Sequence, residues 1–212
     1  MKVYLATNNK NKKREMAAIL SPHTVIVPSD EGISFNPDET GSTFYENSLI
    51  KARALYELVR CPVIADDSGI CVDALGGRPG IYSSRYAGTS LQNGNVLSQA
   101  EKNALLIAEL NDALLHNVDT SHFLHGERSA HYTCAMALYL GNDRLYVAEE
   151  TLEGALVGSM EEARGKNGFG YDPIFFLPEL NKTAAELSDS EKNAISHRGK
   201  AGRAIQNIFL HL

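Results

Sequence analysis

The chain of 212 residues is 43% hydrophobic and 22% charged, a composition typical of globular proteins. Its formal net charge of −6 argues against non-specific binding to nucleic acid or to an anionic membrane, because both need a basic surface. The length fits one large domain or two lobes that share one sheet.

The cysteines and the N-terminus indicate the compartment. Cys61, Cys71 and Cys134 are odd in number and lie in or beside apolar runs. They predict reduced core residues of a cytoplasmic protein, because no CxxC pair indicates zinc or redox chemistry. The first apolar run ends at Ala6, which is too short for a signal peptide or a membrane-spanning helix.

The N-terminal segment predicts a strand, a polar run and a helix. Val3–Ala6 fits a short buried strand, and Lys13–Leu20 has helical spacing and stops before Pro22. The polar run Thr7–Lys12 between them is a candidate anion site, because a helix N-terminus offers backbone N–H groups and lysines add positive charge. An ordinary solvated basic turn is the alternative interpretation.

A strand, a loop and a second helix follow. Thr24–Val27 predicts the strand, and the loop 31–41 contains Glu39, which has no structural role visible in the sequence. Thr43 and Glu46 form a capping box that opens a helix with a regular apolar stripe. The more polar side of this helix carries Glu46, Asn47, Lys51 and Glu57.

The stretch 63–88 has two adjacent carboxylates between apolar runs. Asp66 and Asp67 follow Val63-Ile64-Ala65 and precede Ser68-Gly69, after which a second apolar run begins. The pattern predicts a strand, an acidic turn and a second strand, then two glycine-rich turns. Residues that follow a strand lie on a rim, where loops carry function. Taken alone, the pattern fits an ordinary turn and a functional site equally well.

Regular elements are also predicted in the C-terminal half. Ala100–Leu115 is a strongly amphipathic helix. Tyr132–Leu140 and Leu145–Glu150 predict an antiparallel hairpin, and 149–158 predicts a further strand interrupted at Gly154. Ala201–Leu210 predicts the final helix.

A histidine-bearing loop from Asn117 lies between these elements. The histidines in and around it are His116, His122, His125 and His131. HxxH spacing can bind a metal, but no cysteine or carboxylate set of familiar spacing accompanies it. We therefore favour a surface loop over a metal site.

The loop 164–173 interleaves three glycines with two aromatic residues and a carboxylate. Phe169, Tyr171 and Asp172 belong to it, with Gly170 between the aromatics. Aromatic faces with flexible neighbours suit stacking on a flat ligand such as a base. A bulged strand whose aromatics are core residues is an equal alternative.

A donor-rich segment, 192–200, lies between the last two predicted helices. Lys192, His197 and Arg198 offer several hydrogen-bond donors there and no negative charge. A helix–helix turn with a solvated basic rim is the alternative interpretation. The chain has no P-loop, no strand-linked G-x-G-x-x-G and no G-x-S-x-G elbow. Its basic run, acid pair, aromatic loop and donor segment together fit a nucleotide with its metal.

Five ordered motifs resemble those of the inosine triphosphate pyrophosphatase family, its bacterial members in particular. They are T-x-N-x-x-K-x-x-E from Thr7, E-T-G-x-T-F-x-E-N-x-x-x-K-A from Glu39, A-D-D-S-G…G-G-x-P-G-I-Y-S-x-R from Ala65, G-F-G-Y-D-P-I-F from Gly168 and K-x-x-x-S-H-R from Lys192. The resemblance runs nearly end to end, and only the segment 117–128, with the histidine-bearing loop, matches no motif.

The resemblance implies a fold and a reaction. The fold is a single α/β domain, 1–212, with two lobes around one long curved sheet and the active site in the cleft between them. The reaction is hydrolysis of the non-standard purine nucleotides dITP, ITP and XTP to the monophosphate and pyrophosphate. The resemblance also implies a homodimer that cleanses the nucleotide pool, with a small-molecule substrate.

The resemblance assigns roles to residues of this chain. Asp67 fits the general base and, with Glu39, the carboxylates that bind Mg²⁺; Glu46 and Asp66 are weaker metal candidates. The predicted substrate-binding residues are Thr7, Asn8, Asn9, Lys10, Asn11, Lys12, Lys51, Ser68, Phe169, Gly170, Tyr171, Asp172, Lys192, His197 and Arg198.

The choice of base follows from hydrogen bonding. Lys192 and Arg198 only donate, so a site containing them accepts a 6-oxo purine and disfavours the 6-amino group of adenine. Guanine also has a 6-oxo group, so its rejection is expected at the Phe169–Asp172 loop. The alternative functions are a sister pyrophosphatase for modified pyrimidine or methylated guanine triphosphates, and a nucleotide-binding regulator without turnover. The Asp66-Asp67 pair argues against the regulator.

Overall fold

A computed structural model describes residues 1–87, 97–116, 118–209 and 211. Gly88, Asn117 and Leu210, which the predicted segments include, lie outside the described residues. The chain divides into two compact units, which are described separately. Unit 1 comprises Met1–Ser68, Thr133–Thr151 and Asn193–Leu212, and unit 2 comprises Gly69–Tyr132 and Leu152–Lys192.

Among the described residues, eight strands form one sheet in the order β2-β1-β3-β5-β6-β7-β8, with β4 paired to β3. The strands are β1 (Lys2–Leu5), β2 (Thr24–Ile26), β3 (Val63–Val72), β4 (Arg78–Pro79), β5 (Ser129–Tyr139), β6 (Leu145–Leu156), β7 (Phe175–Leu177) and β8 (Lys182–Thr183). β1 pairs in parallel with β2 and β3, whereas β3–β4, β6–β7 and β7–β8 are antiparallel. The helices are α1 (Lys10–Ile19), α2 (Phe44–Val59), α3 (Gln99–Leu115), α4 (Asp189–Ile195) and α5 (His197–Phe209). The predicted mixed α/β fold is confirmed.

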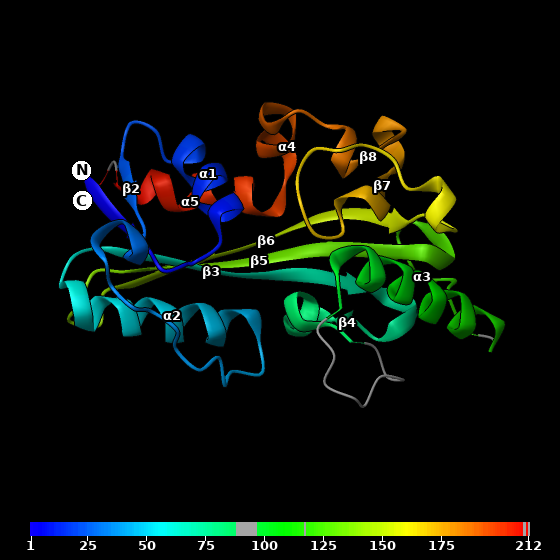
Figure 1. Cartoon of the computed structure of the whole chain (residues 1–212), viewed down its shortest axis with the longest axis horizontal. Coiled ribbons are helices and arrows are strands. Elements are labelled where there is room, and N and C mark those ends of the chain that lie inside the picture. The colour runs from blue at the N-terminus through cyan, green and yellow to red at the C-terminus, as the bar shows by residue number, and fades with distance from the viewer. Residues whose placement is uncertain (88–96, 117, 210, 212) are drawn as a thin grey trace. The chain divides into compact units, whose positions relative to one another are not determined.

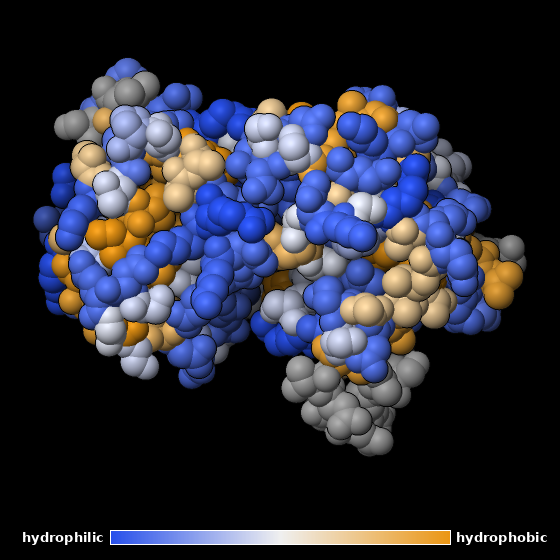
Figure 2. All heavy atoms as spheres, turned by 45° about the horizontal axis from the view of Figure 1, so that its top comes forward, coloured by the Kyte–Doolittle hydropathy of each residue, from blue (hydrophilic) through white to orange (hydrophobic). Residues whose placement is uncertain are grey.

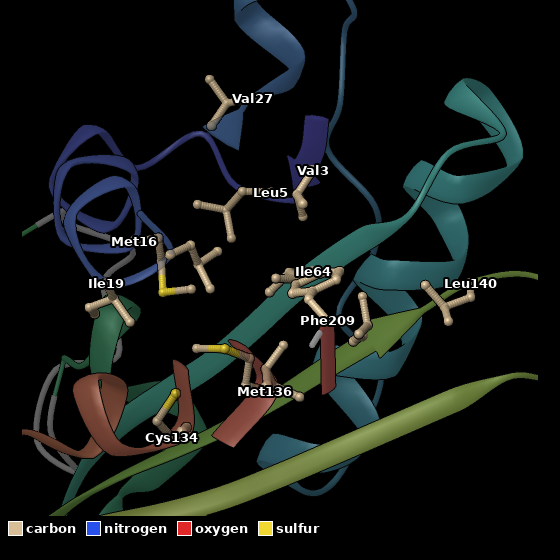
Figure 3. Packing of buried hydrophobic residues seen from close by; sticks show 14 residues of the cluster. Val3, Leu5, Met16, Ile19, Val27, Ile64, Cys134, Met136, Leu140 and Phe209 are labelled. Atoms are coloured by element: carbon tan, nitrogen blue, oxygen red, sulfur yellow. The ribbon is translucent and has the colours of Figure 1, made fainter. Parts of the chain in front are cut away.

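Unit 1 has helices on both faces of its strands. α1 and α5 lie on one face of β3, and α2 lies on the other (Figure 1). Successive strand residues point to opposite faces, so alternate residues fill different cores. Val3, Leu5 and Ile64 pack with α1 and α5, whereas Tyr4, Val63 and Ala65 pack with α2. Figure 3 shows Leu5, Met16, Ile64 and Met136 gathered in the first of these cores.

Unit 2 is built around α3 and the ends of the long strands. α3 buries Leu106, Ile107 and Leu110 on one side. The fully buried Phe175 packs its ring 4.6 Å from that of Tyr132, measured between centroids. These contacts give unit 2 its own apolar interior.

The surface and the thiols agree with the composition. Hydrophilic side chains predominate on the face seen in Figure 2, where hydrophobic ones form small groups. Cys71 and Cys134 are buried free thiols, as predicted, and Cys61 is a half-buried free thiol. Within the described part of the chain, no helix combines the length and the apolar character needed to cross a membrane.

Three predicted element boundaries are wrong. α1 begins at Lys10 rather than at Lys13, so the end of the predicted polar run is helical. β3 is one continuous strand, without the predicted acidic turn. α5 begins at His197 rather than at Ala201, so the predicted break between the last two helices narrows to Ser196. α1 starts early because the neighbouring Asn9 caps it. In β3 and α5, Asp66 and Arg198 pair with each other across a long sequence distance.

The predicted interruption of β6 at Gly154 is also wrong. β6 continues to Leu156. A Cβ atom on Gly154 would lie 2.5 Å from the backbone oxygen of Phe176 and 2.7 Å from the Phe175 ring. Glycine is therefore needed here for close packing, and it does not end the strand.

Candidate active site

The N-terminal polar residues lie at the start of α1. Asn9 is the N-cap, and its Oδ1 accepts hydrogen bonds from the backbone N–H groups of Asn11 at 2.9 Å and Lys12 at 3.3 Å. Thr7 Oγ1 accepts from Asn9 N, and Asn8 Nδ2 donates to Phe35 O at 2.6 Å. Because the cap already satisfies two first-turn amides, the lysine side chains carry most of this segment's capacity for an anion.

Asp66 and Asp67 point to opposite faces of β3. Asp66 faces α1 and α5, where it contacts Lys12 and Arg198. Asp67 faces α2, where it contacts Lys51. The strand alternation separates the two carboxylates, so each has different cations in direct contact with it.

Asp66 is the centre of a buried ionic network. Its Oδ2 lies 2.9 Å from Lys12 Nζ and accepts from Arg198 Nε at 3.2 Å and Nη2 at 3.1 Å. Arg198 also donates to Glu15 Oε2 at 2.6 Å and to Ser68 Oγ at 2.6 Å. Asp66 and Arg198 are only 2% and 3% exposed. Burial opposes ionisation, but Lys12 and Arg198 outweigh it and hold the pKa of Asp66 far below its usual range.

Asp67 has a different environment. Its Oδ1 accepts from Lys51 Nζ at 2.7 Å, and its Oδ2 accepts from Asn47 Nδ2 at 3.4 Å. Burial raises the pKa of Asp67 despite the opposing effect of Lys51. A carboxylate with increased proton affinity, beside a lysine, is suited to accept a proton from water.

Glu39 and Asp67 meet at the same ammonium group. Glu39 Oε1 lies 3.0 Å from Lys51 Nζ, and Asp67 Oδ1 lies 2.7 Å from the same nitrogen. Burial disfavours the charged form of Lys51, but Asp67 and Asp66 outweigh it and raise the pKa of Lys51. The loop before α2 and the strand β3 therefore bring two carboxylates to one cation.

The other candidate metal ligands lie elsewhere. The carboxylate of Glu46 accepts from the backbone N–H of Ser42 at 2.6 Å and from its hydroxyl at 2.8 Å, a role at the start of α2. His131 lies 3.4 Å from Asp73, and His116 contacts the backbone oxygen of Asp112. Of the residues that the structure describes, no three His, Cys, Asp or Glu side chains gather as a metal cluster.

Unit 2 holds the aromatic loop and Lys192. Lys192 Nζ lies 2.7 Å from Asp172 Oδ2 and 4.9 Å from the centroid of the Phe169 ring. Asp172 Oδ2 also accepts from Phe169 N at 2.7 Å, and its Oδ1 accepts from the Tyr132 hydroxyl at 3.2 Å. The ammonium of Lys192 is therefore held between a carboxylate and an aromatic face, while the residue as a whole is 5% exposed.

The two aromatics of this loop are placed differently. Tyr171 is buried, and its hydroxyl donates to Ser83 O at 2.9 Å. Phe169 is only half-buried. Gly168 and Gly170 both have positive φ, and a Cβ on Gly168 would lie 2.1 Å from Asp172 Oδ2. The glycines thus allow the turn in which Phe169 contacts Lys192 while Tyr171 anchors the loop.

The predicted donor set is divided between the units. Lys192 belongs to unit 2 and contacts Asp172, whereas His197 and Arg198 begin α5 in unit 1. His197 is buried, and Arg198 contacts Asp66 and Glu15. Lys192 and Arg198 are thus each paired with carboxylates of their own unit.

Sequence reasoning missed three residues of these arrangements. Glu15 ends the first motif, but the sequence indicates no role for it. Asn47 lies on the polar side of α2, as predicted, but it is 0% exposed and bonds Asp67, a role that the sequence alone did not indicate. Its position one helical turn before Lys51 was the signal that could have found it. Tyr132 had no signal, because its contact with Asp172 joins residues that are distant in sequence.

Known proteins resemble this chain along nearly its whole length. The Ham1 family model matches residues 3–208. The dITP/XTP pyrophosphatase of Treponema denticola is 48% identical, covering 95% of this chain and 94% of its own length. The dITP/XTP pyrophosphatase of Geobacillus kaustophilus is 43% identical, covering 94% of this chain and 89% of its own length. A solved HAM1 protein from Coxiella burnetii has 36% identity and a TM-score of 0.80, with 100% of both chains covered.

Proposed function

This chain belongs to the Ham1 family, and we propose from that premise that it is a nucleoside triphosphate pyrophosphatase acting on non-standard purine nucleotides. Its substrates would be dITP, ITP and XTP, hydrolysed to the monophosphate and pyrophosphate. The names of its relatives support this activity. The observation that carries it is the buried Asp67 carboxylate of raised pKa, placed against Lys51 with Glu39 beside it.

In this mechanism Asp67 is the general base. Its carboxylate accepts a proton from the attacking water as the new P–O bond forms. The phosphoanhydride bond between the α and β phosphates breaks, and pyrophosphate leaves. Lys12 and Lys51 offset the charge of the phosphate oxygens, which matters because phosphoryl chemistry depends mainly on positioning and electrostatics. Thr7 and Asn9 lie in the same segment and are the further phosphate candidates.

The residues around Lys51 fit Mg²⁺. Magnesium in nucleotide enzymes is bound by one or two carboxylates together with substrate phosphates, so Asp67 and Glu39 are a sufficient protein set. Their oxygens already share one cationic partner, Lys51 Nζ. Bound there, Mg²⁺ would neutralise charge on the phosphates.

Lys192 is the donor that we assign first to base recognition. Its ammonium donates to Asp172 and lies on the face of Phe169. A 6-oxo group can accept from such a donor, whereas the 6-amino group of adenine presents another donor. His197 and Arg198, which belong to unit 1, stay the further candidates for this role.

A substrate panel tests this function. Pyrophosphate release is measured for dITP, ITP, XTP and the four standard triphosphates, with and without Mg²⁺. We expect kcat/KM for the non-standard purines to exceed that for dATP by at least about 10²-fold, and turnover to need Mg²⁺. Equal rates on all seven nucleotides, or a preference for one of the four standard triphosphates, would contradict the proposal.

We also propose that the protein works in the cytoplasm as a homodimer. The free thiols fit a reducing compartment. Light scattering on the purified chain tests the dimer, for which the expected mass is twice that of one chain. A monomer at micromolar concentration would overturn this part.

A further inference from the structure

Both polar atoms of the Asn47 side chain form hydrogen bonds within unit 1. Asn47 lies in α2 and is 0% exposed. Its Oδ1 accepts from the backbone N–H of Gly41 at 2.9 Å, and its Nδ2 donates to Asp67 Oδ2 at 3.4 Å. Since only Oδ1 can accept from Gly41, the amide orientation is fixed and its donor end faces the base.

α2 contacts both oxygens of Asp67. Asn47 and Lys51 are four residues apart, so their side chains lie on the same helix face. Lys51 Nζ contacts Oδ1 at 2.7 Å, and Asn47 Nδ2 contacts Oδ2. Two donors from one rigid helix fix the plane of the carboxylate, whereas one donor alone would let it rotate.

The same amide holds the loop that carries Glu39. Gly41 is two residues beyond Glu39, and a Cβ on it would lie 2.8 Å from Asn47 Oδ1 and 2.6 Å from Glu46 Cβ. The loop backbone therefore packs directly on the start of α2. This packing lets Glu39 reach Lys51 at 3.0 Å.

We propose that Asn47 is a positioning residue that fixes Asp67 and the Glu39 loop relative to each other. The proposal rests on the proposed function, in which Asp67 accepts the proton and both carboxylates face the phosphates. Some residues orient such carboxylates without touching the substrate, and substituting them typically lowers activity or metal affinity by about 10–100-fold. Asn47 meets that description with every polar atom of its side chain engaged.

Two variants separate the two bonds. Asn47→Ala removes both, whereas Asn47→Asp keeps the size and an acceptor for Gly41 but replaces the donor to Asp67 by a carboxylate that repels it. Ser48→Ala is the matched control, because Ser48 is equally buried in α2 and its hydroxyl donates to Tyr45 O at 2.8 Å, within the same helix. With dITP, both Asn47 variants should lose about 10–100-fold in kcat while KM changes less than about threefold. Ser48→Ala should keep both constants.

A second measurement does not depend on turnover. Hydrogen exchange at the Gly41 amide should be at least about tenfold faster in Asn47→Ala, because its acceptor is gone, and nearly unchanged in Asn47→Asp. Circular dichroism shows whether each variant is folded. If Asn47→Ala unfolds, the kcat of Asn47→Asp still tests the proposal. If the wild type releases no pyrophosphate, the proposed function fails while exchange still tests the link to the loop. A kcat of Asn47→Asp within threefold of wild type, or unchanged Gly41 exchange in Asn47→Ala, would overturn the proposal.

Discussion

Asp66 and Asp67 are chemically identical neighbours in β3 with opposite surroundings. Lys12 and Arg198 lower the pKa of Asp66 against the effect of burial, whereas burial raises the pKa of Asp67. Two carboxylates whose environments move their pKa values apart can take different roles. We assign the permanent charge of Asp66 to structure and the titratable carboxylate of Asp67 to catalysis.

Replacing the proposed base removes proton acceptance and keeps the shape of the side chain. For Asp67→Asn we expect kcat to fall by about 10²–10⁴, the usual contribution of a general base. Binding of a non-hydrolysable dITP analogue should persist, because Lys12 remains. Calorimetry and pyrophosphate release measure the two effects. Turnover within a few-fold of wild type would remove Asp67 from its role.

The raised pKa of Asp67 predicts the acid side of the pH profile. A protonated carboxyl cannot take a proton from water, so activity falls as pH drops through the pKa of Asp67. Because burial raises that pKa, the fall should occur above the ordinary aspartate value of about 3.9. Measurement of kcat/KM from about pH 4 to about pH 9 checks this, with thermal unfolding at each pH as the control. Full activity down to the ordinary value would contradict it.

Asp66 should govern stability. Asp66→Asn leaves Lys12 and Arg198 without the buried carboxylate that they share, and breaking a buried ion pair costs about 3–5 kcal/mol. The folded pKa of Asp66 is lowered, so its stabilisation is present above about pH 3.9 and is lost as pH falls below that value. Urea unfolding of variant and wild type measures the loss. An unchanged midpoint would show that the network contributes nothing net.

At the scale of elements, local patterns predict most helices, whereas β3 and the start of α5 depend on a pair of side chains from distant segments. Periodicity predicted α2 and α3 well, because their apolar stripes are local features of the sequence. The sequence did not predict that β3 is continuous or where α5 starts. Asp66 and Arg198 are charged and suggest exposed loop ends, but they pair with each other although they are 132 residues apart in the sequence. No local pattern contains such a pairing.

Gly154 gives a direct test of this packing at the element scale. In Gly154→Ala the new Cβ would fall 2.5 Å from Phe176 O, so β6 or β7 must shift. Overpacking of this kind costs about 1–3 kcal/mol. Denaturant unfolding measures it, and the exposed Glu149→Ala in the same strand is the control, expected within about 0.5 kcal/mol. An equal free energy of unfolding for both variants would show that close packing does not require glycine at position 154.

At the scale of the whole molecule, the proposed tasks belong to different units. Lys12, Lys51 and Asp67 lie in unit 1, whereas Phe169 and Lys192 lie in unit 2. The motifs name these residues as phosphate, catalytic and base candidates, and those roles stay predictions. The contacts that hold them, such as Tyr132 with Asp172, join distant segments and could not be predicted.

This division predicts separable effects. Lys192→Gln removes the cation beside Phe169 and should lower kcat/KM for dITP by about 10–100-fold relative to dATP. Inhibition by inorganic tripolyphosphate, which has no base, should stay within about threefold of wild type because the phosphate residues are untouched. Steady-state kinetics measure both. A parallel loss of tripolyphosphate inhibition would show that Lys192 serves the phosphates instead.

Because side chains along β3 alternate between the two faces of the sheet, the site is sensitive to the number of residues before Asp66. Asp66 and Asp67 differ in role only because one peptide step turns the side chain to the other face of the sheet. An insertion of one residue between Ile64 and Asp66 would send each carboxylate to the other face, with a charge facing the α2 core and the base facing Arg198. Spacing along this strand therefore carries as much information as the identity of the two acids.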